Sequence, residues 1–194
     1  MLKIVSRLIL LVKGWSYHVD ALKTLDKCVL IVAPHTSAWD MAIGKAIFVL
    51  AKIPAKIAIK KEVFFWPINW FLRYLGGFPI DRTPKDGSKQ RMSLVDALVN
   101  SVKKEKKIVL VITPEGSRGK RKQWKTGFYH IAVKAQVPIA LGYLDFDVKE
   151  GIVEKIFYPT GDMDKDMREI MDFYKDKTHL GKYPNRCITD ERWS

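Results

Sequence analysis

Cysteine is scarce in this chain, and long hydrophobic runs do not occur. Among 194 residues there are two cysteines, Cys28 and Cys187, whose spacing suits neither a metal site nor a disulfide framework. We therefore expect a reducing compartment and no bound metal. No stretch stays apolar for the roughly eighteen residues that a membrane-spanning helix needs. Repeats, low-complexity tracts and linkers are also missing, and the length indicates one domain with a sizeable core.

Acidic residues are few relative to basic ones. Lysine and arginine number 34 against 21 aspartates and glutamates, which gives a net charge of +13. A chain this basic is expected to meet an acidic partner, such as nucleic acid, an anionic membrane surface or a polyanionic substrate. Hydrophobic residues make up 47% and charged residues 28%, a balance that excludes wholesale disorder.

The N-terminal segment has some features of a signal peptide. However, Lys3, Arg7 and Lys13 interrupt its apolar residues, and no small-residue cleavage site follows. An amphipathic helix, lying on a membrane or docked on the domain, explains the pattern better. Trp15 and Tyr17 just beyond it suit a membrane interface, where amphipathic rings are favoured. We predict a membrane-associated amphipathic helix over residues 1–17 and a single domain over residues 18–194.

Strand-like and helix-like segments alternate along the rest of the chain. Short apolar, often β-branched runs predict strands at residues 28–33, 56–59, 78–80, 108–113 and 138–143. Apolar periodicity predicts helices at residues 41–51, 88–104, 128–135 and 164–175. This alternation is typical of a single α/β domain with a mostly parallel central sheet flanked by helices.

His35 and Asp40 stand where the first predicted strand gives way to a helix, the place where open α/β sheets keep reactive groups. Residues five apart on one helix point about 140° away from each other. The two side chains can therefore meet only if His35 lies on the loop and Asp40 lies in the first helical turn. Asp40 would then hold one imidazole nitrogen and leave the other free to accept a proton. The segment from Ser37 to Asp40 also fits a capping box, which would cap the helix without catalysis, and the two roles are compatible.

Two further segments carry glycines and arginines next to predicted strands. The segment from Gly76 to Arg82 ends with an arginine, whose fork of donors matches phosphate oxygens, although a plain surface turn has the same pattern. The segment from Thr113 to Gly119 follows the clearest strand. Its glycines let backbone N–H groups approach an anion, and Arg118 adds positive charge. The alternative for this segment is an ordinary polar turn.

A basic cluster surrounds the second of these segments. Its members are Arg118, Lys120, Arg121, Lys122 and Lys125, with Trp124 among them. Such clusters are usually solvated faces, and basic residues with an aromatic also suit nucleic acid. The position beside the candidate site favours an anionic substrate. An aromatic run over residues 64–75 has too many rings to hide on one helix face, so a core and a lipid-facing interpretation both stay open.

Taken together, these segments resemble the glycerolipid acyltransferases, typified by 1-acylglycerol-3-phosphate (lysophosphatidic acid) acyltransferase. The blocks of that family are matched in order by His35 and Asp40; by Gly76, Ile80, Asp81 and Arg82; by Pro114, Glu115, Gly116 and Arg118, with Ser117 in place of threonine; and by Val137 and Pro138. The fourth block lacks its second proline, since Leu141 stands there. The Lys125-x-Gly127 pair also looks like the family. Any one block is weak, but the order and spacing of all four are specific.

The resemblance implies an O-acyltransferase in which His35 is the general base and Asp40 orients and charges its imidazole. The acceptor hydroxyl then attacks the thioester of acyl-CoA or acyl-carrier protein directly, with no covalent acyl-enzyme and no cofactor. The implied substrate-binding residues are Ser37, Arg82, Glu115, Gly116, Ser117, Arg118 and Lys125. Of these, Arg82 and Arg118 are expected to bind a phosphate, and Lys125 to add a further phosphate contact.

Two alternatives stay open at this point. The missing proline and the compact size allow an acceptor other than lysophosphatidic acid, including a lyso-aminolipid without phosphate, whereas Arg82 and Arg118 favour a phosphate-bearing lysolipid. A non-catalytic protein that binds anionic lipid or nucleic acid would have no need of His35 with Asp40. We expect an enzyme of phospholipid biosynthesis at the cytoplasmic face of a membrane, peripheral or monotopic, without a nucleic-acid partner.

Overall fold

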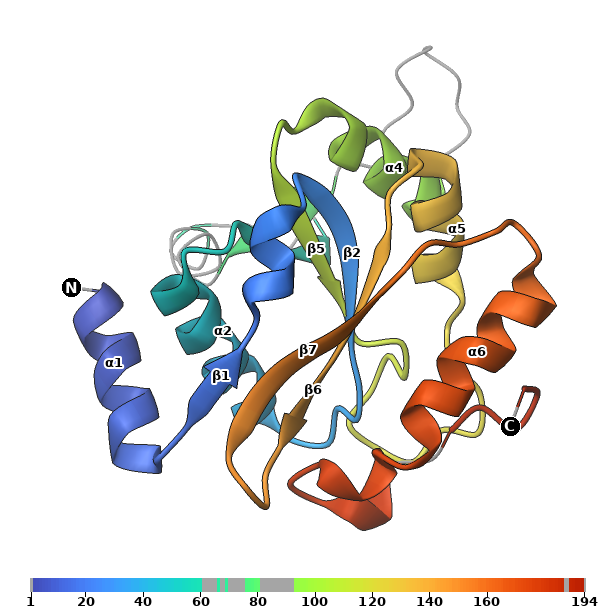
Figure 1. Ribbon diagram of the computed structural model, residues 1–194. Coiled ribbons are helices and arrows are strands. Elements are labelled where there is room, and N and C mark those ends of the chain that lie inside the picture. The colour runs from blue at the N-terminus through green and yellow to red at the C-terminus, as the bar shows by residue number, and fades with distance from the viewer. Residues whose placement is uncertain are drawn as a thin grey trace.

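The computed structural model describes residues 2–60, 66, 69, 76–80, 93–186 and 189–193 (Figure 1). Within these residues, seven strands form one sheet in the order β1-β7-β6-β2-β5-β3-β4. The strands are β1 (Ser16–His18), β2 (Lys27–Val32), β3 (Ala55–Lys60), β4 (Gly77–Ile80), β5 (Ile108–Ile112), β6 (Ile139–Asp145) and β7 (Glu150–Phe157). Every pairing is parallel except that of β6 with β7. The predicted α/β fold with a mostly parallel sheet is confirmed.

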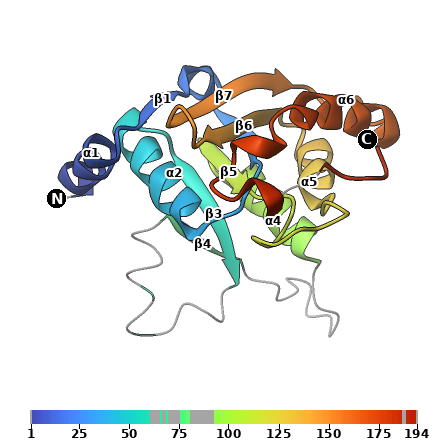
Figure 2. The ribbon, with the colours of Figure 1, turned by 90° about the horizontal axis from the view of Figure 1, so that it is seen from below.

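Helices cover both faces of the sheet (Figures 1 and 2). One face is covered by α1 (Leu2–Lys13) and α2 (Ala38–Ala51), and the other by α4 (Leu94–Lys104), α5 (Gly127–Ala135) and α6 (Met163–Lys175). Strand β2 shows why its sequence is a continuous apolar run. Val29 and Ile31 point into the core on one side, and Cys28 and Leu30 into the core on the other. The four central positions of this strand are buried on both faces and leave no place for a polar residue.

The N-terminal segment is shorter as a helix than the predicted span of residues 1–17. Helix α1 ends at Lys13, and Ser16–His18 forms strand β1, which pairs in parallel with β7. Residues just past the helix therefore belong to the central sheet. The helix packs along α2 and buries Ser6 and Leu10 against the domain. Among the helices that the structure describes, none is long and apolar enough to cross a membrane.

Two other elements, β7 and α4, differ from expectation. Strand β7 was not predicted, because charged residues interrupt its apolar ones. Helix α4 begins at Leu94 after the cap residue Ser93, later than the predicted start at residue 88, and residues 81–92 lie outside the described part. Most of the aromatic run also lies outside it; of that run the structure describes Trp66, which is 87% exposed, and Asn69.

Candidate active site

Two loops meet at one edge of the sheet. Strands β2 and β5 pair in parallel, with Ile31 opposite Ile112, so both strands end at the same edge. The loop after β2 carries His35, and the loop after β5 begins with Thr113 and carries Glu115. Side chains that follow the carboxyl ends of neighbouring parallel strands converge at such an edge, where ligands of open α/β sheets bind.

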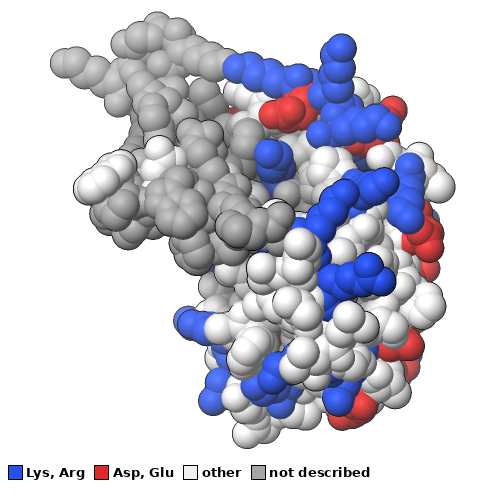
Figure 3. Space-filling view, turned by 90° about the vertical axis from the view of Figure 1, so that its left-hand side faces the viewer, with Lys and Arg blue, Asp and Glu red and all other residues white. Residues whose placement is uncertain are grey.

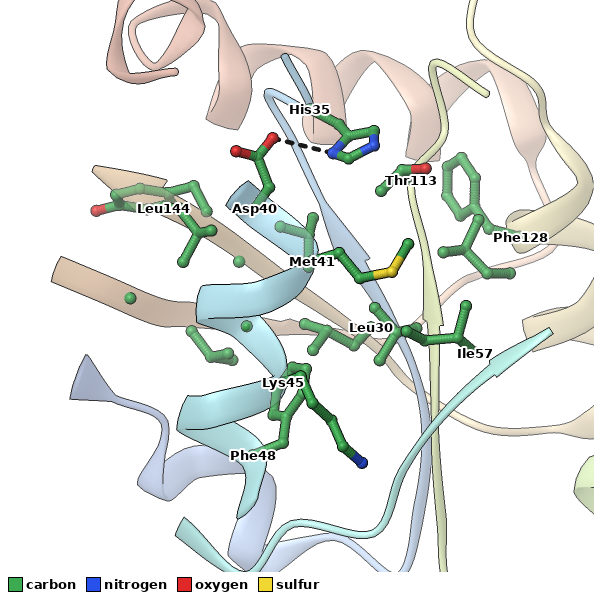
Figure 4. A pocket seen from close by; sticks show the side chains of 18 of the residues that line it. Leu30, His35, Asp40, Met41, Lys45, Phe48, Ile57, Thr113, Phe128 and Leu144 are labelled. Carbon is green, nitrogen blue, oxygen red and sulfur yellow. Dashed lines mark hydrogen bonds and ion pairs between the residues drawn. The ribbon is translucent and has the colours of Figure 1, made fainter. Parts of the chain in front are cut away.

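His35 and Asp40 are in direct contact (Figure 4). The Nδ1 atom of His35 lies 3.0 Å from Oδ2 of Asp40, and the two side chains are 15% and 5% exposed. His35 lies on the loop and Asp40 in the first turn of α2, which confirms the arrangement that the spacing required. A carboxylate can only accept, so this contact places the proton of neutral His35 on Nδ1 and the lone pair on Nε2. The Nε2 side of the ring points away from Asp40, toward the part of the cavity where Thr113 lies (Figure 4).

The same carboxylate also caps helix α2. Its Oδ2 accepts hydrogen bonds from the backbone N–H of Thr36 at 2.9 Å and of Ser37 at 3.0 Å. The Ser37 hydroxyl accepts the N–H of Trp39 at 3.1 Å, which completes the predicted capping box. The capping interpretation is therefore confirmed without excluding the histidine contact. Ser37 is buried in this cap, and its predicted contact with substrate stays a prediction.

Glu115 joins the two loops. Its Oε2 accepts the backbone N–H of His35 at 2.8 Å, and the residue is 6% exposed. The contact spans 80 positions in the sequence. Glu115 thus fixes the main chain of His35, while Asp40 fixes the ring. The resemblance placed Glu115 among the substrate-binding residues; a direct substrate contact stays a prediction.

Gly116 and Lys125 lie against each other beside His35. Gly116 has a φ of +66°, in the left-handed region that favours glycine. A Cβ at this position would lie 2.7 Å from Cε of Lys125, so no larger residue fits without displacing the lysine. Gly116, Lys125 and Thr113 all line the same cavity as His35. The side chain of Lys125 thus faces the same cavity as His35.

The remaining predicted residues of the acceptor site are placed differently. Ser117 accepts a hydrogen bond from Nε of Arg121 at 2.9 Å. Arg118 is exposed, and in the described part of the chain neither Ser117 nor Arg118 lines the cavity. Arg82 lies outside the described residues. The structure therefore brings His35, Asp40, Gly116 and Lys125 together and leaves the roles of the arginines as predictions.

A cavity of about 440 Å³ extends from His35 into the protein (Figure 4). This volume falls in the range of roughly 300–1,000 Å³ that is usual for small-molecule sites. Below His35 the wall is mainly apolar, with Leu30, Met41, Phe48, Ile57, Leu98 and Phe128 among its residues. An elongated apolar group can occupy this space while a polar group stays near His35 and Lys125.

Lys45 is a pocket residue that the sequence did not reveal. It lines the cavity from helix α2, and its side chain extends away from His35 (Figure 4). Partial burial, together with the nearby charge of Lys56, lowers the pKa of Lys45 below its ordinary value. No local signal distinguishes this lysine from a surface lysine, because much of the apolar wall around it comes from elements other than α2. For metal binding, the described residues contain no group of three or more histidine, cysteine or acidic side chains that could hold an ion.

Comparisons with known proteins give a family match and a similar solved structure. The model of the family described as Acyltransferase matches residues 17–140. The structure is similar to the crystal structure of the 1-acyl-sn-glycerophosphate (LPA) acyltransferase PlsC from Thermotoga maritima. The TM-score is 0.56 at 15% sequence identity, and the similarity covers 89% of this chain and 74% of that one. None of the curated proteins matches this chain in sequence.

Proposed function

Because the chain belongs to the acyltransferase family, we propose that it transfers a fatty acyl group from a thioester donor to the hydroxyl of a lysolipid, with 1-acylglycerol-3-phosphate as the acceptor. The observation that carries this proposal is the His35–Asp40 pair at the polar end of a long apolar cavity. The arrangement supplies a base, a place for an aliphatic chain and a cation in the same cavity, and the proposed reaction uses all three.

In the proposed reaction His35 acts as a general base. Its Nε2 takes the proton of the acceptor hydroxyl while the hydroxyl oxygen attacks the thioester carbonyl carbon. Asp40, 3.0 Å from Nδ1, stabilises the imidazolium that forms. The tetrahedral intermediate then collapses, the carbon–sulfur bond breaks, and the thiolate leaves with the proton that His35 returns. No group of the enzyme becomes acylated in this scheme.

The anionic end of the acceptor is proposed to meet Lys125. This lysine lines the cavity beside His35, and its side chain is held over Gly116. Arg118 on the same loop and Arg82 are proposed as further phosphate contacts, by the resemblance of their blocks to the family. An arginine or lysine beside a phosphate forms charge-assisted hydrogen bonds, which are about twice as strong as neutral ones.

The apolar part of the cavity is proposed to hold the acyl chain. Its walls come from both faces of strands and from α2, α4 and α5, and they contain few polar groups. Each methylene removed from water contributes about 0.8 kcal/mol. Binding of the chain in this cavity would therefore bring the thioester to His35 without any specific polar contact along the chain.

Acyl transfer by the purified protein tests this function. Donors would be acyl-CoA and acyl-carrier protein in separate arms. Acceptors would be lysophosphatidic acid, other lysophospholipids and a lyso-aminolipid, with products identified by mass spectrometry. A diacyl product formed from lysophosphatidic acid is expected. Product from the lyso-aminolipid alone would replace the proposed acceptor, and no product in any arm would favour a non-catalytic binding protein.

We also propose that the protein docks peripherally on an anionic membrane through α1. Ile4, Leu8, Leu11 and Val12 on this helix are 65%, 54%, 68% and 79% exposed. The face that carries α1 shows many more Lys and Arg side chains than acidic ones, with uncharged surface between them (Figure 3). Insertion of aliphatic side chains at a membrane contributes about 1 kcal/mol each at this exposure, and each nearby basic residue about 1 kcal/mol more.

Residues distant in the sequence extend this surface. Trp39, at the start of α2, is 44% exposed, and the Nζ atoms of Lys13 and Lys182 lie 5.0 Å and 5.5 Å from its ring centre. Trp39 directly precedes Asp40, so a membrane that contacted this tryptophan would lie close to the candidate active site. A lysolipid could then reach His35 from the bilayer surface.

Sedimentation with vesicles that contain phosphatidylglycerol tests the docking. Exchanging Leu8 and Leu11 for glutamine is expected to release the protein from the vesicles. Tyr158→Gln is the matched control, because Tyr158 is 67% exposed and follows β7 at the end away from β1. Equal binding of both variants would contradict the proposal.

A further inference from the structure

The C-terminal residues 189–193, which we call the strap, lie against the loop between β5 and α5 (Figure 1). This loop, residues 113–126, contains Glu115, Gly116 and Lys125. The strap holds both polar groups of the Trp124 backbone. The Trp124 N–H donates to Oδ2 of Asp190 at 2.6 Å, and the Trp124 carbonyl accepts a hydrogen bond from Nη2 of Arg192 at 2.8 Å. The N–H of Glu191 donates to the carbonyl of Lys122 at 3.2 Å.

Asp190 is the centre of the strap. Its side chain is fully buried, and besides the Trp124 N–H it accepts hydrogen bonds from the backbone N–H, Nε and Nη2 of Arg192. Oδ1 and Oδ2 each accept hydrogen bonds, so an acceptor is required at both positions. Although burial opposes ionisation, the bonds from Arg192 and the Trp124 N–H hold the pKa of Asp190 below its ordinary value.

The strap is itself anchored to helix α6. The indole Nε1 of Trp193 donates to Oδ1 of Asp164 at 2.9 Å, and the N–H of Asp190 contacts Sδ of Met171 at 3.4 Å. The Trp124 ring is buried and packs edge-on against Tyr174, also on α6, with ring centres 5.3 Å apart. The loop is thus tied through the strap to a helix that packs on the core.

The loop requires such support for two reasons. It has no regular secondary structure over residues 113–126, so its order is not maintained by a helix or strand ladder. It also carries Arg118, Lys120, Arg121, Lys122 and Lys125, all exposed, and like charges at this density repel one another. Contacts from outside the loop must offset both the entropy and the repulsion.

The support reaches the candidate active site in two steps. Lys125 directly follows the clamped Trp124, and its N–H donates to the carbonyl of Pro114 at 2.7 Å. The Lys125 side chain then lies across Gly116 and lines the cavity beside His35. A shift of Trp124 would therefore move the lysine that faces the anionic group of the substrate.

We propose that Asp190 is a positioning residue for substrate binding, and that the strap it organises keeps Lys125 at the mouth of the cavity. This inference rests on the proposed function for the identity of the anionic group, a phosphate monoester on an aliphatic chain. The strap lies beyond residue 140, where the family match ends. It is therefore a feature that the family resemblance does not supply.

Binding of dodecyl phosphate, measured by titration calorimetry, tests the proposal without turnover. Asp190→Asn puts an amide NH2 against donors and is expected to weaken binding about tenfold, the loss of one charge-assisted contact. Lys125→Met is expected to weaken it by a similar factor. The double variant is expected to be no weaker than Lys125→Met alone, because both changes remove the same contact.

Asp166→Ala is the matched control. Asp166 is another buried carboxylate, with bonds from Tyr129 and from the N–H and hydroxyl of Thr160, and these partners belong to neither the loop nor the strap. This variant is expected to lose stability yet bind dodecyl phosphate as the wild type does. Hydrogen exchange of residues 114–126 should accelerate in Asp190→Asn and not in Asp166→Ala.

Three results would overturn the proposal: wild-type affinity in Asp190→Asn, equal weakening in Asp166→Ala, or additive effects of the Asp190 and Lys125 changes. Failure of acyl transfer in every donor and acceptor arm would instead reject the proposed function. The binding and exchange measurements would still decide whether the strap positions Lys125. In an active enzyme, Asp190→Asn is expected to raise KM for the phosphate-bearing acceptor about tenfold with kcat changed far less.

Discussion

Replacing Asp40 with asparagine separates the two roles of this side chain. Oδ2 accepts three hydrogen bonds, from Nδ1 of His35 and from the backbone N–H groups of Thr36 and Ser37. An asparagine oxygen in the same place can accept all three. Oδ1 is buried and has no partner in the described part of the chain, so the new amide NH2 takes a position that was already unsatisfied. We expect the free energy of unfolding to change by less than about 1 kcal/mol.

The catalytic effect of the same change is expected to be large. The amide has no charge with which to stabilise the imidazolium that forms when His35 takes a proton. Replacement of the aspartate in a comparable aspartate–histidine pair lowers kcat by about 10⁴, and general base catalysis as a whole contributes about 10²–10⁴. We therefore expect kcat of Asp40→Asn to fall between about 10²-fold and 10⁴-fold. Steady-state acyl transfer and urea unfolding would be measured on the same preparation.

Two comparison variants make the result interpretable. Asp40→Ala leaves the buried N–H groups of Thr36 and Ser37 without an acceptor, at a cost of about 1–3 kcal/mol for each group. Ser93→Ala removes the cap of α4, where the hydroxyl accepts the N–H of Asp96 at 3.1 Å, and should cost about 1 kcal/mol with kcat unchanged. If Asp40→Asn kept its stability and also kept kcat within a few-fold, Asp40 would be a helix cap and the proposed mechanism would be refuted.

Three further predictions concern the cavity, a buried thiol and the strap. Gly44 lines the cavity, and Gly44→Leu is expected to fill part of it and shift donor preference toward shorter acyl chains. The change also replaces a helical glycine, which favours the folded state by about 0.5–1 kcal/mol. A change in the acyl-chain length of the product, measured by mass spectrometry, would therefore not reflect unfolding. Burial raises the pKa of the Cys28 thiol to about 12. In a Cys187→Ser background, a disulfide reagent at pH 8 should therefore react with Cys28 after denaturation and not before. Rapid reaction of Cys28 in the native protein would contradict the fold. The folded-state pKa of Asp190 is below its unfolded value of about 3.9, so its contribution to stability is present above that pH and is lost as the pH falls through the folded-state pKa. The wild type should therefore lose more stability below about pH 4 than Asp190→Asn does. Parallel pH profiles of the two proteins would be evidence against the ion pair of Asp190 with Arg192.

Much of the fold could be predicted from local patterns. The runs that became β2 and β5 are buried on both faces, and such strands are unbroken apolar stretches that stand out in a sequence. Strands β1 and β7 could not be found this way. β1 is three residues long and consists of Ser16, Tyr17 and His18, while β7 pairs antiparallel with β6 and carries charged residues on a half-exposed surface. Their pairing is decided by tertiary contacts, which no local pattern reports.

The candidate site could likewise be predicted from the sequence only in part. The contact of His35 with Asp40 follows from a spacing of five residues and a helix start, so the sequence was sufficient to predict it. The hydrogen bond from the His35 N–H to Glu115 spans 80 positions in the sequence, and the one from the Trp124 N–H to Asp190 spans 66. Both depend on how strands and loops are brought together in space. The family block singles out Glu115 but does not predict its bond to His35, and the sequence marks Asp190 only as an acid near the end of the chain.

Removal of the His35 imidazole tests the central claim most directly. The measurement is steady-state acyl transfer to lysophosphatidic acid by wild type and His35→Ala. The donor is the one, acyl-CoA or acyl-carrier protein, that gives product with the wild type, and native structure is checked by circular dichroism. The account predicts that kcat falls by at least about 10²-fold while KM for lysophosphatidic acid changes little, because Lys125 and the cavity still bind the substrate. A folded His35→Ala variant that transfers acyl groups at nearly the wild-type rate would contradict it.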